Sequence, residues 1–186
     1  MAALCSGRAR RRCRKNALIA VGENPIDLAS TDNVVLNRSF IEGLIARLMK
    51  DENKARSAFT DARAEQEKIV RAQPNYAEGW CALGLIDAGL GRKEDALREG
   101  RRAVELLPVE KDAINGPLMI TYLAMTAAWA GDRDLACAQL GIVIRPPSTV
   151  SYGQLKLLPF WDSLRGDPRF QKIVGSLAPK NTKEQP

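Results

Sequence analysis

Histidine is absent from this chain, which removes the side chain that most often serves as general base and metal ligand near neutral pH. Catalysis would then depend on paired carboxylates or on lysine. The acidic residues that could pair fall at positions that helical periodicity places on exposed faces: Asp61, Glu65, Glu78, Glu94, Asp95, Glu99 and Glu105. We therefore expect no catalytic residue and no enzymatic activity.

The cysteines could supply thiolate chemistry only if the fold brought them together. They are Cys5, Cys13, Cys81 and Cys137, and no two of them form a CxxC pair. Spacings of this kind have no metal-ligand pattern, so we expect neither a metal site nor a bound cofactor. Free thiols of this sort are typical of proteins in a reducing compartment, which predicts a cytoplasmic location.

Basic residues gather at the start of the chain. The first fifteen residues hold six of them and no acid, which accounts for the whole net charge of +6: Arg8, Arg10, Arg11, Arg12, Arg14 and Lys15. One interpretation is a patch for nucleic acid or a membrane surface. The other interpretation is that residues 1–15 are a disordered leader, or that the start codon was chosen upstream of the true domain. No aromatic residue stands in the run to stack on bases, and the rest of the chain is neutral, so we favour the leader over nucleic-acid binding.

Composition points to helices rather than sheets. Hydrophobic residues make up 45% of the 186 residues, whereas aromatic residues make up only 5%, and alanine is frequent. This suits closely packed helices in one globular or solenoid domain. No apolar run approaches the ~18–20 residues that a membrane-spanning helix needs. The first fifteen residues also lack the apolar region of a secretory signal.

Residues 77–110 follow the 34-residue template of a helical hairpin repeat. The matching residues stand at template positions 4, 7, 8, 20, 27 and 32, and they are Trp80, Leu83, Gly84, Ala96, Ala103 and Pro108. Gly84 and Ala96 have small or no side chains, so the two helices of the hairpin can approach closely. Asp87 and Gly100 depart from the template, because aromatic residues are usual at their positions. The repeat predicted here is the tetratricopeptide (TPR) repeat.

One such hairpin cannot bury its apolar face alone, so neighbouring repeats are expected. The pattern predicts a first repeat over 36–76 and a third over 117–147, with Pro117 as an early helical residue. The expected proline of the first repeat is missing, which predicts one long second helix over Lys54–Ala72. Residues 111–116 form an insertion between the second and third repeats.

The segments that flank the repeats are of three kinds. A helix-and-turn segment is expected over 16–35 and a polar, disordered tail over 179–186. Residues 148–178 are apolar, and we expect them to cap the open end of the solenoid, with a short helix over Ser151–Leu158 and a packed loop at Pro159–Trp161. Asp167, followed by Pro168, is typical of a helix start.

A second, more specific resemblance adds context to the predicted all-α fold. It is carried by four runs: Leu83–Leu85, Gly91–Val109, Lys111–Ala113 and Leu164–Phe170. These runs resemble the C-terminal TPR region of large bacterial signalling proteins, in which it follows a serine/threonine kinase, an adenylate cyclase or a winged-helix domain. The resemblance implies a TPR α-solenoid of about three helical hairpins with a C-terminal capping segment. It also implies a scaffold that binds a protein or peptide partner.

The first helices of TPR hairpins line the concave face, where partners usually dock. The groove residues expected from the repeat positions are Asn37, Phe40, Leu44, Arg47, Glu78, Cys81, Leu85, Thr121, Met125 and Trp129. This mixture suits a helix or an extended apolar peptide. Chaperone-binding TPR domains instead place Lys, Asn and Arg at such positions, so we do not expect that function. An alternative left open by the sequence is that Tyr152–Leu177 covers part of the groove.

Overall fold

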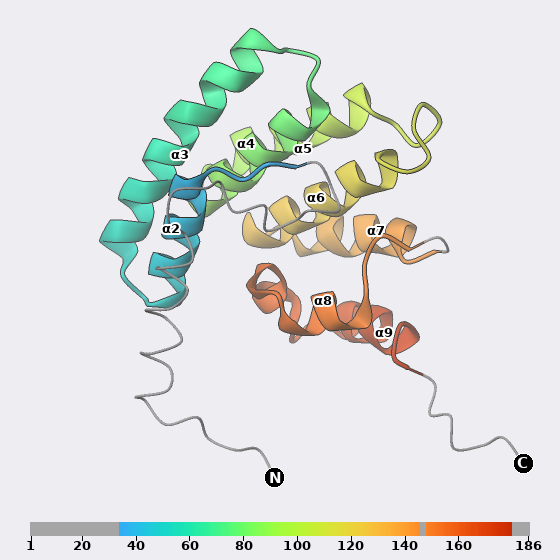
Figure 1. Cartoon of the computed structure of the whole chain (residues 1–186). Coiled ribbons are helices and arrows are strands. Elements are labelled where there is room, and N and C mark those ends of the chain that lie inside the picture. Colours follow the sequence, from blue (N-terminus) through green and yellow to red (C-terminus); the bar gives the residue numbers. More distant parts are fainter. Residues whose placement is uncertain (1–33, 146–147, 180–186) are drawn as a thin grey trace, which may run out of the picture.

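The computed structural model describes residues 34–145 and 148–179, and these residues form helices without any β-strand among them (Figure 1). The all-α prediction is thereby confirmed for this part of the chain. The predicted leader 1–15, nearly all of the 16–35 segment, Pro146 and Pro147, and residues 180–186 of the predicted tail lie outside the described residues. None of the described helices is both long and apolar enough to cross a membrane.

Six of the described helices form three successive antiparallel hairpins (Figure 1). Their bounds are α2 Arg38–Leu48, α3 Glu52–Ala72, α4 Ala77–Gly89, α5 Lys93–Leu106, α6 Gly116–Trp129 and α7 Arg133–Val143. Within each hairpin the two helices pack along their length, and α4 also contacts α3 and α6, while α5 contacts α6. The central hairpin therefore joins the other two.

Local signals in the sequence explain where these helices begin and end. The side chains of Asn37, Asp51 and Asp132 each accept a hydrogen bond from the backbone N–H three residues later, which caps α2, α3 and α7. The turns inside the second and third hairpins each contain a glycine with positive φ, Gly91 at 77° and Gly131 at 80°. A side chain would be strained there, so glycine suits both turns.

Helix α3 extends well beyond its partner α2, as the missing proline predicted. It has 21 residues against the 11 of α2 (Figure 1). The overhanging part packs on α4: the Gln66 side chain donates a buried hydrogen bond to the Gly79 carbonyl oxygen at 2.9 Å, and Val70 is buried nearby. The extra turns of α3 therefore hold the first hairpin to the second.

The chain after the third hairpin folds back onto α6. It contains α8 Tyr152–Leu157, a 3₁₀ helix η1 over Pro159–Leu164, and α9 Pro168–Ser176. Ser151 caps α8 in a reciprocal capping box, and Asp167 caps α9, as its sequence signal predicted.

The prediction of a packed loop at Pro159–Trp161 was wrong in its conformation, because these residues begin η1. Proline has a fixed φ and no N–H, so it fits the first turn of a helix. In a 3₁₀ helix, residues three apart lie on the same side. Trp161 and Leu164 therefore bury their side chains together, while the neighbouring Ser163 hydroxyl donates to the Ala128 carbonyl oxygen of α6 at 2.7 Å.

Candidate functional site

The predicted groove residues divide into a buried and an accessible set. Phe40, Cys81, Leu85 and Thr121 are buried, so their side chains belong to the core and do not reach a partner in this conformation. The others are half-buried or exposed, namely Asn37, Leu44, Arg47, Glu78, Met125 and Trp129. The surface open to a partner is therefore narrower than the repeat positions predicted.

An aromatic cluster explains the closure of the groove. The ring of Trp129 on α6 has its centroid 6.3 Å from that of Phe40 on α2, 6.1 Å from Phe59 on α3 and 4.9 Å from Phe160 in η1. The contact with Phe160 means that the C-terminal segment covers part of the predicted groove. This alternative was left open by the sequence, which gives helix positions but not how far the hairpins curve toward one another.

The accessible part of the surface centres on Arg47 and Trp129. The Arg47 guanidinium lies 4.8 Å from the centroid of the Trp129 ring, and its Nη1 donates to the Gly89 carbonyl oxygen at 3.3 Å. These three residues come from the C-terminal ends of α2, α4 and α6. The first helices of all three hairpins therefore converge at this point.

Two cavities adjoin this contact, and we call them together the Arg47–Trp129 cleft. The first, of about 360 Å³, lies between the start of α3 and the end of α4 and includes Glu52 and Arg56. The second, of about 240 Å³, lies between α2, α6 and η1, and its wall includes Leu44 and Leu48. The Leu48 side chain is 55% exposed, which makes it an apolar contact available at the surface.

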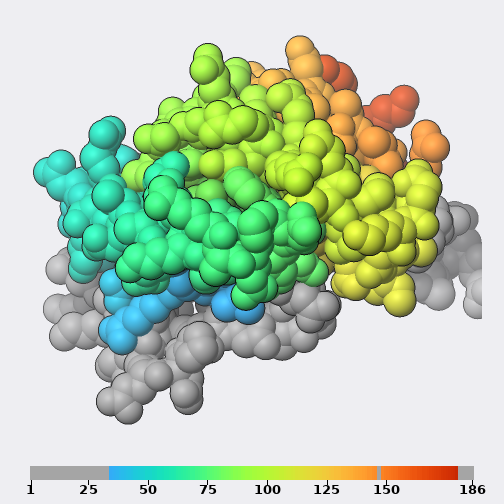
Figure 2. Space-filling model, turned by 90° about the horizontal axis from the view of Figure 1, so that it is seen from above, coloured from blue at the N-terminus to red at the C-terminus, as the bar shows by residue number. Residues whose placement is uncertain are grey.

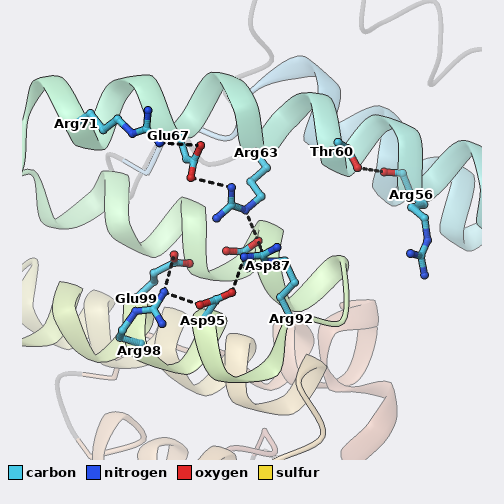
Figure 3. Close-up of polar contacts among 10 residues, drawn as sticks. All are labelled: Arg56, Thr60, Arg63, Glu67, Arg71, Asp87, Arg92, Asp95, Arg98 and Glu99. Carbon is cyan, nitrogen blue, oxygen red and sulfur yellow. Dashed lines mark hydrogen bonds and ion pairs between the residues drawn. The ribbon is translucent and has the colours of Figure 1, made fainter.

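A pair of buried acids lies in the central hairpin, between α4 and α5. Asp87 is 0% exposed and Glu99 is 3% exposed. The prediction that Glu99 occupies an exposed helix position was wrong, because its side chain turns inward toward Asp87 instead of toward solvent. Buried carboxyl groups need partners, and Asp87 has two: the Nε of Arg63 lies 2.8 Å from its Oδ1, and the Nε of Arg92 lies 3.3 Å from the same oxygen (Figure 3).

Further charges surround this pair in a network that joins three elements (Figure 3). On α3, Arg63 also bonds Glu67 at 2.7 Å. On the α5 side, Asp95 bridges Arg92 and Arg98, with both Nη2-to-oxygen distances at 2.6 Å. The arginines therefore link α3, the α4–α5 turn and α5 around the buried acids.

Glu99 holds its proton far more tightly than an ordinary glutamate. Burial, and after it the adjacent Asp87 carboxyl group, raise the pKa of Glu99 to about 8. Arg98 and Arg63 act in the opposite direction without reversing the effect; the Nη2 of Arg98 lies 3.8 Å from Glu99 Oε1. Near neutral pH the Glu99 side chain is therefore largely a carboxylic acid, next to the Asp87 carboxyl group.

The sequence held a signal for each acid of this pair. Asp87 stands where the repeat template usually has an aromatic residue, and so does Gly100. A β-carbon at Gly100 would lie 2.9 Å from Leu123 Cδ1, so the leucine of the next hairpin occupies the space of the missing side chain. For Glu99 the signal was its helical face, because it stands three residues after Ala96 and four before Ala103, the small residues expected between the two helices.

The two cysteines within the described residues are buried and form no disulfide, Cys81 on α4 and Cys137 on α7. The Cys81 Sγ contacts the Met119 Sδ at 3.5 Å. Burial raises the pKa of the Cys137 thiol. Within 34–145 and 148–179, no three potential ligands among Cys, Asp and Glu come together as a metal site would require.

The arrangement can hold an apolar side chain against an arginine and an indole ring, and neither Asp87 nor Glu99 lines the two cavities. Met125 and Trp129 lie on the same helix as the core residue Thr121, so α6 carries both the accessible surface and the core. When the chain was compared with protein-family models, curated proteins and solved structures, no family model, protein or structure matched it.

Proposed function

We propose that this protein is a non-catalytic TPR-type interaction module that binds a helical or extended peptide at the Arg47–Trp129 cleft. The observation that carries the proposal is the convergence of Arg47, Gly89 and Trp129, one from the first helix of each successive hairpin. In solenoids of paired helices, partners dock on the face that these helices share. A surface assembled from three hairpins suits a ligand that extends along them.

The packing of the central hairpin supports the TPR assignment. A β-carbon at Gly84 would come within 3.1 Å of the Gly100 nitrogen, so the two helices lie in close contact at the template glycine. Ala96 and Ala103, the small residues of the second helix, are both fully buried. Small residues thus stand where the template requires close approach.

The lining of the cleft favours an amphipathic partner. Leu44 and Leu48 supply apolar surface beside the indole of Trp129, while Arg47, Arg56 and Glu52 supply charges of both signs. An amphipathic helix that buries two or three apolar side chains and keeps its polar face in water meets these requirements. From the resemblance to bacterial signalling proteins, we place the module in a cytoplasmic regulatory system of that kind.

The test is to select peptides from a random display library on the full chain and to measure their affinity by titration. A selected peptide should bind at one site and saturate. Leu48→Asp places a charge in the wall of the cleft without disturbing the core, because Leu48 is already exposed. This variant should lose at least about tenfold in affinity, equivalent to about 1.4 kcal/mol.

Ile142→Asp is the matched control, since Ile142 is a similarly exposed apolar residue on α7 that does not line the cleft. It should bind the selected peptides with the affinity of the parent. Equal affinity of the parent and Leu48→Asp would show that the peptides dock elsewhere. A library that yields no saturable binder would contradict the proposed function itself.

A further inference from the structure

Two oxygen atoms of the buried acid pair have no hydrogen-bond donor in the structure, Asp87 Oδ2 and Glu99 Oε2. An ionised carboxylate only accepts hydrogen bonds, so two ionised groups could not satisfy one another. A buried polar atom without a partner is costly, and two buried negative charges side by side are more so. Figure 3 shows the two carboxyl groups facing each other in the space between α4 and α5.

The arginines leave one place for a proton. Arg63 and Arg92 both approach Oδ1 of Asp87, so its Oδ2 is free to accept from another group. A proton on Glu99 Oε2 that is donated to Asp87 Oδ2 would satisfy both orphaned atoms at once. We propose that Asp87 and Glu99 share one proton and that this proton locks α5 to α4, so that the central hairpin is a pH-sensitive element of the protein.

The charged side chains that face the pair from the neighbouring elements already have partners among themselves. This is consistent with one proton shared by Asp87 and Glu99. Helix α3 contributes Arg63 and Glu67, and these two side chains are paired with each other. The α4–α5 turn contributes Arg92, and α5 contributes Asp95 and Arg98, again as mutual partners.

Helix α6 packs on both α4 and α5, and it contains no Asp, Glu, Lys or Arg. Its one titratable side chain is the buried Tyr122. A charge from α6 therefore does not compensate a second ionised carboxylate between α4 and α5. When Glu99 loses its proton, the hydrogen bond across the hairpin is replaced by repulsion between two carboxylates.

The direction of the effect on stability follows from the raised pKa of Glu99. The folded protein keeps this proton up to a pH of about 8, whereas in the unfolded chain the group ionises near 4.5. Between those values the folded state binds more protons, so the stability that the proton provides is complete at lower pH and is lost as the pH rises toward 8. One proton changes the unfolding equilibrium constant by up to about tenfold per pH unit.

The decisive experiment compares the parent with Glu99→Gln by denaturant unfolding of the full chain at pH values from about 5 to about 9. Glutamine has nearly the same shape and donates an N–H to Asp87 at every pH, so it imitates the protonated acid. The ratio of the parent's unfolding constant to that of Glu99→Gln should rise by at least about tenfold across this range. Glu105→Gln is the matched control: it is an exposed glutamate on the same helix, and its profile should parallel that of the parent.

Infrared spectroscopy of the folded parent gives a readout that does not depend on the variant's stability. A protonated carboxyl group has a carbonyl band distinct from that of carboxylates, and this band should be present near pH 6 and vanish above pH 9. Parallel unfolding profiles for the parent and Glu99→Gln would overturn the proposal. So would the lack of a protonated carboxyl band near pH 6, even if Glu99→Gln did not fold.

Discussion

A β-carbon added at Gly84 would lie 3.0 Å from the carbonyl oxygen of Ala96 on the facing helix. The next nearest atom is the backbone nitrogen of Gly100. Because both atoms belong to the backbone, neither can move aside as a flexible side chain would. Gly84→Leu should therefore force α4 and α5 apart and destabilise the protein, since overpacking costs about 1–3 kcal/mol or more. The measurement is the free energy of unfolding from denaturant titration.

Gly141→Ala is the control for this substitution. Gly141 lies within α7, and a β-carbon there meets nothing within 4 Å. Alanine is favoured over glycine inside a helix by about 1 kcal/mol, so this variant should be equal to the parent or more stable. If Gly84→Leu unfolded at the same denaturant concentration as the parent, the close contact between α4 and α5 would be disproved.

The ion pair between Arg63 and Asp87 should matter far more than the surface pairs. Arg63→Met leaves the buried Asp87 with only the more distant Arg92. Breaking a buried pair typically costs about 3–5 kcal/mol, and since Arg63 is partly exposed we expect the lower end of that range. Adding Asp87→Leu to Arg63→Met removes the unpaired buried charge and should recover part of the loss, but not all of it, because the proton proposed on Glu99 then has no acceptor.

Arg71→Met provides the comparison for the ion pair. Arg71 also pairs with a glutamate of α3, at 3.5 Å, but its side chain is 78% exposed. Exposed pairs of this kind contribute about 0–1 kcal/mol, so its unfolding free energy should barely change. Similar losses for the Arg71 and Arg63 variants would argue against the buried network as the source of stability.

Most of the helical architecture could be predicted because it depends on local signals. The long helix over Lys54–Ala72 followed from unbroken periodicity, and the start of α9 followed from Asp167 and Pro168. The conformation of Pro159–Trp161 could not be predicted in the same way. Pro159 fits the start of a helix, but a proline does not by itself distinguish a 3₁₀ turn from a loop, and the burial of Trp161 depends on the rest of the fold.

The candidate site was less predictable than the fold. Arg47 and Trp129 were named from repeat positions, but their contact depends on how the first hairpin lies against the third, which repeat positions do not give. The Phe40 ring, which was expected in the groove, is buried against Phe59 and Trp129. Glu99 was missed because an acid is normally solvated, although its place three residues after Ala96 and four before Ala103 puts it on the buried face of α5.

Removing the C-terminal segment after residue 147 should destabilise the protein more than the loss of peripheral residues would. In a chain ending at 147, α6 loses the cover of η1, in which Phe160, Trp161 and Leu164 are buried. We expect a chain that keeps its helical circular dichroism signal but aggregates or melts without cooperativity. Size-exclusion chromatography and thermal melting check this. A soluble monomer with the parent's transition would indicate that the segment is a separable docking peptide.

The start of α9 should be sensitive to acid. The Arg169 side chain and the Arg169 backbone N–H donate to the Asp167 carboxylate and lower its pKa to about 2. Because the folded pKa lies below the ordinary 3.8, the stability from this carboxylate is present above that value and is lost as the pH falls toward 2.

Arg169→Met keeps the aspartate cap but removes the guanidinium, which also reaches Asp134 on α7 at 2.7 Å. The variant should therefore melt at a lower temperature than the parent near neutral pH. The gap between the two melting temperatures should close as the pH falls toward 2, which thermal melts at a series of acidic pH values would measure. A constant gap would mean that Arg169 acts through packing alone.

The overhang of α3 changes how the chain comes apart as well as how it is held together. Repeat proteins whose neighbours interact weakly can unfold one hairpin at a time from an end. Here the part of α3 beyond α2 is bonded to α4 through Gln66 and Arg63, so the first hairpin cannot open without breaking contacts of the second. In the space-filling view the blue-green residues of the first hairpin lie directly against the green residues that follow them (Figure 2). Amide protons of α2 through α5 should consequently exchange with solvent as one cooperative unit, and fraying from this end is suppressed.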